Sequence, residues 1–297
     1  MVEMDIIFHN SDIASKLFLI HHFFSPVKTD TDIINDYFVG GVSKALMANA
    51  VYRKDNNIFR KKALALEICN IMSIAQEYSN DSNELKKTLG SLEIKGAILS
   101  NDEMVKFEGN IKTTFDNIEQ INHFLNDIFL FKLPKETHII LTKSPETRSF
   151  GETILFDPPL IGLSVNDKTR SVPAIVLHEL LHVLIARSGI IHNSAGSKPD
   201  NSISTPRMFS ETLIGYFAPY GILAQKLGMV NNISLSAIKE TCRNVDYIPE
   251  VETLEKIMKE YENYIGQKNI WDFLNENNCG HLINQNILAQ LRQNAER

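Results

Sequence analysis

The feature that most constrains this chain is an apolar stretch, residues 172–186, that is interrupted only by His178, Glu179 and His182. Nine of the twelve residues from 175 to 186 are apolar, so a helix built from them is hydrophobic on every side. Such a helix has to be buried, and it takes its polar side chains into the core with it. Burying these three side chains without hydrogen-bonding or metal partners would cost several kcal/mol in all.

Signals at both ends set the length of this helix. Ser171 can cap the first turn, Pro173 suits a position inside that turn, and Gly189 suits the position just past the last turn. We therefore predict one buried helix between Ser171 and Gly189.

The three polar residues have the spacing of a metal site. Residues four apart lie one above the other on a helix, so His178 and His182 can direct their imidazole nitrogens at a single ion. Glu179 lies about 100° further round the helix, where its carboxylate reaches a water molecule at the ion without binding the ion itself. Two nitrogen ligands, an open coordination position and a carboxylate base are what zinc-assisted hydrolysis needs.

The sequence His178-Glu179-Leu180-Leu181-His182 resembles the HExxH signature of the zincin zinc metallopeptidases. The resemblance covers roughly residues 135–228 and implies an α+β catalytic subdomain with short strands and an active-site helix. Turn residues between the short β-type runs of 134–170 favour a small, mostly antiparallel sheet there. The resemblance also implies a Zn²⁺ cofactor held by His178 and His182, with Glu179 as the general base. The alternative is a core helix whose two histidines and glutamate only form hydrogen bonds.

A third ligand must come from elsewhere in the chain. The metzincin pattern would need Gly at 185 and His at 188, where this chain has Ile185 and Ser188. The gluzincin pattern takes a glutamate from the next helix, and Glu211, 29 residues after His182, fits it. His192 and Asp200 stay open as alternatives.

By the same resemblance, a Tyr, His or Arg would stabilise the oxyanion of the transition state. We assign this catalytic role to Tyr216; Tyr220, His192 and Arg207 are the other candidates. An edge strand of the sheet, 153–156 or 160–165, would hold a peptide substrate in extended form.

Hydrophobic periodicity and turn residues outline the rest of the chain. We divide it into a mainly helical N-terminal lobe, residues 1–134, and a catalytic domain with C-terminal helices, residues 135–297. The expected strands are 5–9, 138–142, 153–156 and 160–165. The expected helices are 33–51, 58–74, one long helix over 104–128, the active-site helix, a helix from 204 or 205 to 227 kinked at Pro219, and three more near 235–244, 250–266 and 281–295.

Composition excludes some functions. A net charge of -6 gives no electrostatic attraction to nucleic acid. No run reaches the roughly 18 apolar residues of a membrane span, and the acidic start does not resemble a secretion signal, so we expect a cytoplasmic protein with free cysteines. The predicted function is a zinc metallopeptidase acting on a peptide or protein. The alternatives are an inactive zincin-fold scaffold and an HExxH hydrolase of a non-peptide amide.

Overall fold

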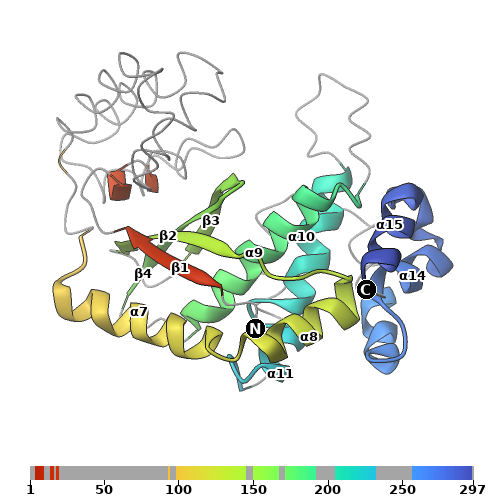
Figure 1. The fold of residues 1–297 in the computed structure, drawn as a ribbon, viewed down its shortest axis with the longest axis horizontal. Helices are drawn as coiled ribbons and strands as arrows, with labels where there is room; N and C mark the ends of the chain where they lie inside the picture. The colour runs from red at the N-terminus through yellow and green to blue at the C-terminus, as the bar shows by residue number, and fades with distance from the viewer. Residues whose placement is uncertain are drawn as a thin grey trace, which may run out of the picture. The chain divides into compact units, whose positions relative to one another are not determined.

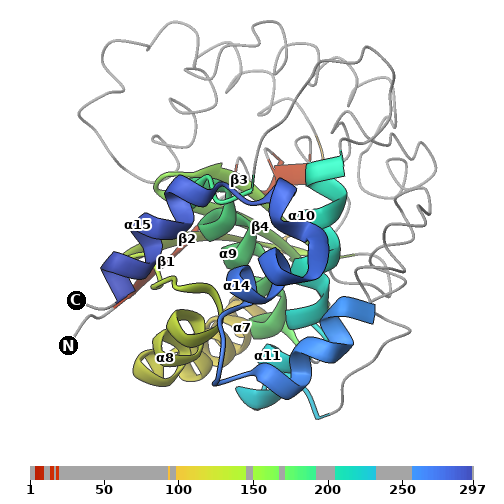
Figure 2. The same cartoon turned by 90° about the vertical axis from the view of Figure 1, so that its right-hand side faces the viewer.

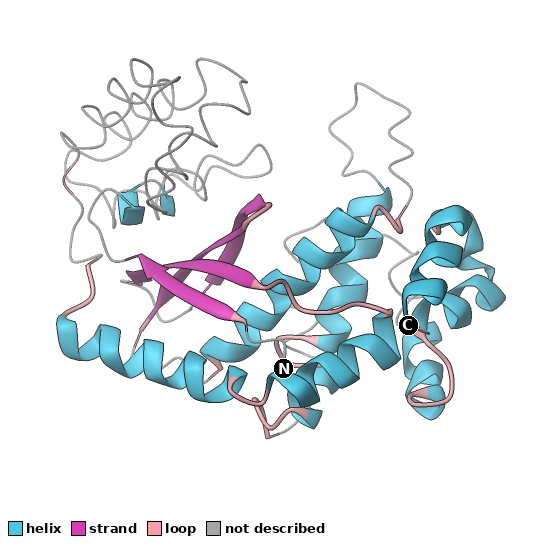
Figure 3. Cartoon of the chain, viewed as in Figure 1, coloured by secondary structure: helices cyan, strands magenta, loops and turns pink. Residues whose placement is uncertain are grey.

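A computed structural model describes residues 4–9, 14–16, 18–19, 93, 98–144, 150–166, 171–191, 205–231 and 256–295 of the chain. The expected helices at 33–51, 58–74 and 235–244 lie outside these residues. The described part is mixed α/β, with strands shown in magenta and helices in cyan in Figure 3. None of its helices is long and apolar enough to cross a membrane.

The chain forms two compact units, each drawn from separate stretches of sequence. We call Asp5–Asn110 with Glu136–Val172 the sheet unit, and Met1–Met4, Ile111–Lys135 and Pro173–Arg297 the helical unit. The sequence suggested a single division of the chain, at residue 134. The two compact units instead alternate along the sequence.

The described residues of the sheet unit form four strands, labelled in Figure 1: β1 (Asp5–His9), β2 (Glu136–Lys143), β3 (Phe150–Phe156) and β4 (Pro159–Val165). The strand order is β1-β2-β4-β3. All four strands agree with the sequence prediction within a few residues. Every residue of β4 is buried, so this strand takes an inner position with a neighbour on each side.

The expectation of a mostly antiparallel sheet was wrong. β1 pairs with β2 in parallel, β2 pairs with β4 in parallel, and only β3 and β4 form an antiparallel hairpin. Turn residues between the runs favoured antiparallel neighbours, whereas β4, which is buried along its whole length, lies inside the sheet and pairs in parallel with β2. β4 lies between β2 and β3, which leaves β3 at the edge with Phe156 exposed. Of the two candidate edge strands, therefore, only the one containing 153–156 lies at an edge.

Gly162 allows close packing on the inner strand. A Cβ atom added there would lie 2.0 Å from the ring of Phe18, which is fully buried. The ring therefore occupies the space that any larger residue at 162 would need.

The predicted helix over 104–128 is two helices, α7 (Asn101–Phe115) and α8 (Ile118–Phe129). The break falls at Asp116 and Asn117, residue types whose side chains compete with the helix for backbone hydrogen bonds. The apolar spacing continues through the break, because Phe115 and Ile118 are three residues apart, and periodicity alone therefore hides it.

The rest of the helical unit, in its described residues, contains further α-helices and short 3₁₀ or π helices. They are α9 (Val172–Ser188), α10 (Thr205–Phe217), α11 (Ile222–Lys226), η1 (Glu262–Tyr264), α14 (Ile270–Leu274), η2 (Asn275–Cys279), η3 (Gly280–Leu282) and α15 (Gln285–Ala295). Residues 256–261 are also helical, within the predicted 250–266. The helix expected up to 227 ends earlier, at Phe217, because Pro219 has no N–H to continue it, and α11 follows as a separate helix.

An aromatic cluster forms the core between α8, α10 and α14. The ring of Phe129 meets that of Phe217 edge-on at 4.7 Å, and Trp271 lies 6.0 Å from Phe129. The indole N–H of Trp271, which is fully buried, donates to the carbonyl oxygen of Phe129 at 2.7 Å. Trp271 is thus a packing residue.

A reciprocal cap fixes the start of α7 in the sheet unit. The Ser100 N–H donates to Glu103 Oε2 at 2.8 Å, and the Glu103 N–H donates to Ser100 Oγ at 3.3 Å. Lys143, at the end of β2, donates to the other oxygen of Glu103 at 2.6 Å. These contacts lower the pKa of Glu103 from 4.5 to about 2, and the hydrogen bond from Lys143 has the largest effect.

We predict that Glu103→Gln lowers the free energy of unfolding at pH 7 by about 1 kcal/mol, the usual value of a cap with a partly exposed ion pair. Because the folded pKa of Glu103 is depressed, its contribution is present above pH 4.5 and is lost as the pH falls towards 2. Urea denaturation at pH 7 and pH 3 measures this difference, with the exposed Glu260→Gln as control. A difference that does not shrink at pH 3 would contradict the assignment.

Candidate metal centre

The site is built on α9, whose burial agrees with the prediction from its sequence. Every residue from 172 to 185 is buried except His182, whose side chain is 19% exposed. The helix ends before Gly189, which has a φ of 66°, a left-handed conformation that glycine adopts without strain. Figures 1 and 2 show α9 and α10 side by side within the helical unit.

Three side chains from these two helices converge. The Nε2 atoms of His178 and His182 are 3.1 Å apart, and Glu211 Oε2 on α10 lies 3.3 Å from His182 Nε2. One ligand atom from each residue lies within 4.8 Å of the other two, so the group could hold a metal ion. The structure therefore brings together the three residues that the sequence predicts as one cluster.

The two short separations match the edges of a small coordination sphere. Bonds of about 2.0–2.1 Å in a tetrahedron place neighbouring ligand atoms about 3.3–3.4 Å apart. Without an ion, a proton on His182 Nε2 could be donated to His178 or to Glu211, and the three lone pairs would share that one proton. An ion satisfies all three at once.

A backbone carbonyl fixes the tautomer of His178. The Nδ1–H donates to the carbonyl oxygen of Ala218 at 2.8 Å, and because a carbonyl can only accept, Nδ1 carries the proton. The Nε2 atom of the neutral ring then presents its lone pair to the cluster. Burial, with the neighbouring His182 as a second cause, lowers the pKa of His178 from 6.5 to about 4, which keeps the ring neutral at pH 7.

Glu179 is buried, with 5% of its surface exposed, but it does not belong to the converging group. It follows His178 directly on α9, so its side chain leaves the helix about 100° away from that ligand. Glu179 is therefore the immediate neighbour of a ligand on α9, although it is not one of the three converging residues.

The other predicted residues have different outcomes. His192 and Asp200 lie outside the described residues, as does the side chain of Arg207. Tyr220 is half-buried. Tyr216 is buried and its hydroxyl donates to Glu262; it follows Glu211 by five residues, roughly 140° round α10. The described contacts therefore give Tyr216 a partner other than the cluster.

Sequence reasoning missed two groups, Ala218 and Glu262. Ala218 acts through its backbone, which no residue type signals, although its place at the end of a helix carrying a ligand could have drawn attention to its carbonyl. Glu262 lies in an exposed segment, 51 residues after the ligand Glu211. No local sequence pattern connects it to the site.

Comparison with protein-family models, curated proteins and solved structures finds no match to this chain. The interpretation of the site consequently depends on its own geometry.

We predict that Glu211→Gln weakens binding of Co²⁺, a spectroscopic probe of the site, by at least about 100-fold, beyond the 10–100-fold typical of changes outside the ligand shell. An amide lacks the charge of the carboxylate and binds a divalent ion poorly. Titration followed by visible absorption measures the affinity, and Glu260→Gln serves as a matched exposed control. Equal affinity in Glu211→Gln and the control would exclude Glu211 as a ligand.

Proposed function

We propose that this protein is a zinc-dependent metallopeptidase that uses Glu179 as its general base. The observation that carries the proposal is the convergence of His178, His182 and Glu211, with the buried Glu179 next to them in the sequence. The HExxH signature supports the same assignment from the residue types alone.

The donor set favours zinc. Two imidazole nitrogens and one carboxylate oxygen suit a borderline ion, whereas calcium and magnesium prefer shells made of oxygen atoms. Three protein ligands also leave a fourth position for water or substrate, as in catalytic rather than structural zinc sites. A fully structural site would usually have four protein ligands and no use for Glu179.

The residues of the chain divide the chemistry between them. A bound zinc ion supplies Lewis acidity, which polarises water and the carbonyl of the scissile bond. His178 and His182 hold their nitrogens at a fixed separation, and the Ala218 carbonyl keeps His178 oriented. Glu179 accepts a proton from the attacking water and then delivers it to the nitrogen of the leaving amine, so one carboxyl group acts as base and then as acid.

We predict that Glu179→Gln retains one bound zinc per chain but hydrolyses peptides about 10²–10⁴-fold more slowly, the usual contribution of a general base. The amide keeps the size of the side chain but cannot accept the proton. Metal analysis measures the zinc, and a pool of fluorogenic peptides measures hydrolysis. Removal of zinc by a chelator should abolish wild-type hydrolysis, and zinc should restore it.

Three results would contradict the proposal: hydrolysis by Glu179→Gln at the wild-type rate, hydrolysis that persists after zinc is removed, or a wild-type protein that binds zinc and cleaves no member of the pool. A parallel assay with non-peptide amides would then identify a hydrolase of the other class. Glu260→Gln is the matched control for the substitution itself, because this glutamate is exposed and lies outside the centre.

A further inference from the structure

The last turn of α10 and the residues after it, 216–221, connect the metal centre to the C-terminal part of the helical unit. We call this segment the α10 terminal turn. Its Ala218 carbonyl accepts the hydrogen bond from His178, while the Ala218 N–H donates to the carbonyl of Ile214 at 2.9 Å. A Cβ atom added at Gly221 would lie 1.9 Å from the backbone carbonyl oxygen of Tyr216, so residues 216 and 221 approach each other closely.

Tyr216 holds this turn from the side away from Glu211. Its side chain is 3% exposed, and its hydroxyl donates to Glu262 of η1. The next residue, Phe217, packs against Phe129 at 4.7 Å and Tyr261 at 6.2 Å. The turn is therefore held by aromatic packing at one residue and by a single hydrogen bond at its neighbour.

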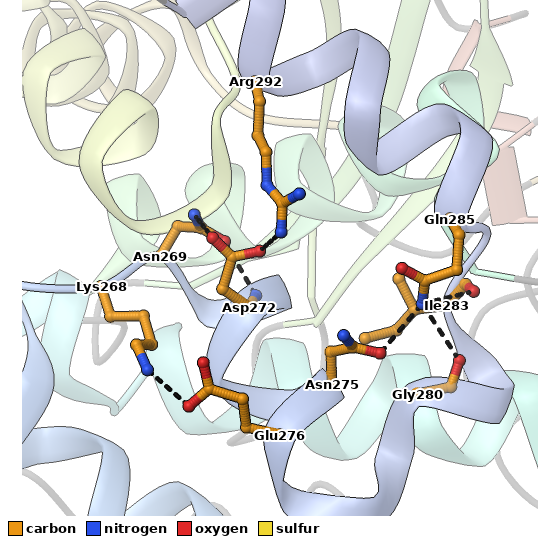
Figure 4. Close-up of polar contacts among 9 residues, drawn as sticks. All are labelled: Lys268, Asn269, Asp272, Asn275, Glu276, Gly280, Ile283, Gln285 and Arg292. Atoms are coloured by element: carbon orange, nitrogen blue, oxygen red, sulfur yellow. Dashed lines mark hydrogen bonds and ion pairs between the residues drawn. The ribbon is translucent and has the colours of Figure 1, made fainter.

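The backbone that carries Glu262 is anchored by the residue before it. The preceding residue, Tyr261, is fully buried, its ring lies 5.1 Å from that of Phe273, and its hydroxyl donates to the carbonyl of Lys268 at 2.8 Å. Figure 4 shows the polar contacts that continue from there: Lys268 pairs with Glu276, and Arg292 of α15 pairs with Asp272 of α14. The anchored backbone at Tyr261 thus places the Glu262 carboxylate within reach of the Tyr216 hydroxyl.

We propose that Tyr216 and Glu262 are positioning residues for the metal centre. Their hydrogen bond holds the α10 terminal turn where the Ala218 carbonyl accepts the Nδ1–H of His178, which keeps the Nε2 lone pair directed at the ion. The inference builds on the metal centre of the proposed function, and it gives Tyr216 a role other than the catalytic one expected from sequence.

The experiment uses the full chain with Tyr216→Phe, Glu262→Leu and Glu262→Gln. The last variant keeps a side-chain oxygen that can accept from Tyr216. Tyr264→Phe and Glu260→Gln, both exposed, are the matched controls. Two quantities are measured: the His178 tautomer in metal-free protein, from ¹⁵N–¹H spectra assigned with His178→Asn, and the Co²⁺ dissociation constant.

We expect the wild type, both controls and Glu262→Gln to show the Nδ1–H tautomer of His178. Tyr216→Phe and Glu262→Leu should show a population of the Nε2–H tautomer and about 10-fold weaker Co²⁺ binding, the usual effect of losing a group that orients a ligand. The double variant Tyr216→Phe/Glu262→Leu should bind Co²⁺ no more weakly than either single variant, because each substitution removes the same hydrogen bond.

An unchanged tautomer, or Co²⁺ affinity within twofold of wild type in Tyr216→Phe and Glu262→Leu, would overturn the proposal, even if their melting temperatures fall. The tautomer is measured without metal or substrate. A wild-type protein that binds Co²⁺ but cleaves no peptide would therefore count against the peptidase assignment and leave this inference standing.

Discussion

Two imidazole nitrogens from the middle of a buried apolar helix and a carboxylate oxygen from the next helix lie within 4.8 Å of one another, and this convergence places the strictest requirement on the helical unit. Lone pairs so close repel each other unless a proton or a metal ion lies between them, and only a metal ion binds all three at once. The neutral state of His178, the direction of its Nδ1–H and the proximity of α10 to α9 all serve to hold that arrangement.

The arrangement depends on a chain of contacts that leads away from the ligands. His178 depends on the Ala218 carbonyl, and the segment carrying Ala218 is held by Phe217 and by the Tyr216 hydroxyl. Aromatic packing supplies much of the stabilisation there, since each buried ring removes a large apolar area from water. The hydrogen bonds, each smaller in net energy, decide orientation.

What could be predicted from the sequence was local. The end signals and apolar run defined α9, and the four-residue spacing of His178 and His182 required only helix geometry. Glu211 could be anticipated because it lies on the next helix. Strand pairing depends on burial by distant residues, which periodicity does not contain. The helix break at Asp116 and Asn117 has a local cause, but the apolar spacing continues through it and hides it. The partner of Tyr216 is 46 residues away, and no spacing rule reaches it.

Crystallography with anomalous diffraction at the zinc edge, on protein grown with zinc, tests the central claim most directly. The account predicts one anomalous peak per chain, at about 2.0–2.2 Å from His178 Nε2, His182 Nε2 and a carboxylate oxygen of Glu211, with a fourth position open to solvent. It would be contradicted by zinc bound elsewhere, or by the two histidines and Glu211 joined only by hydrogen bonds at saturating zinc.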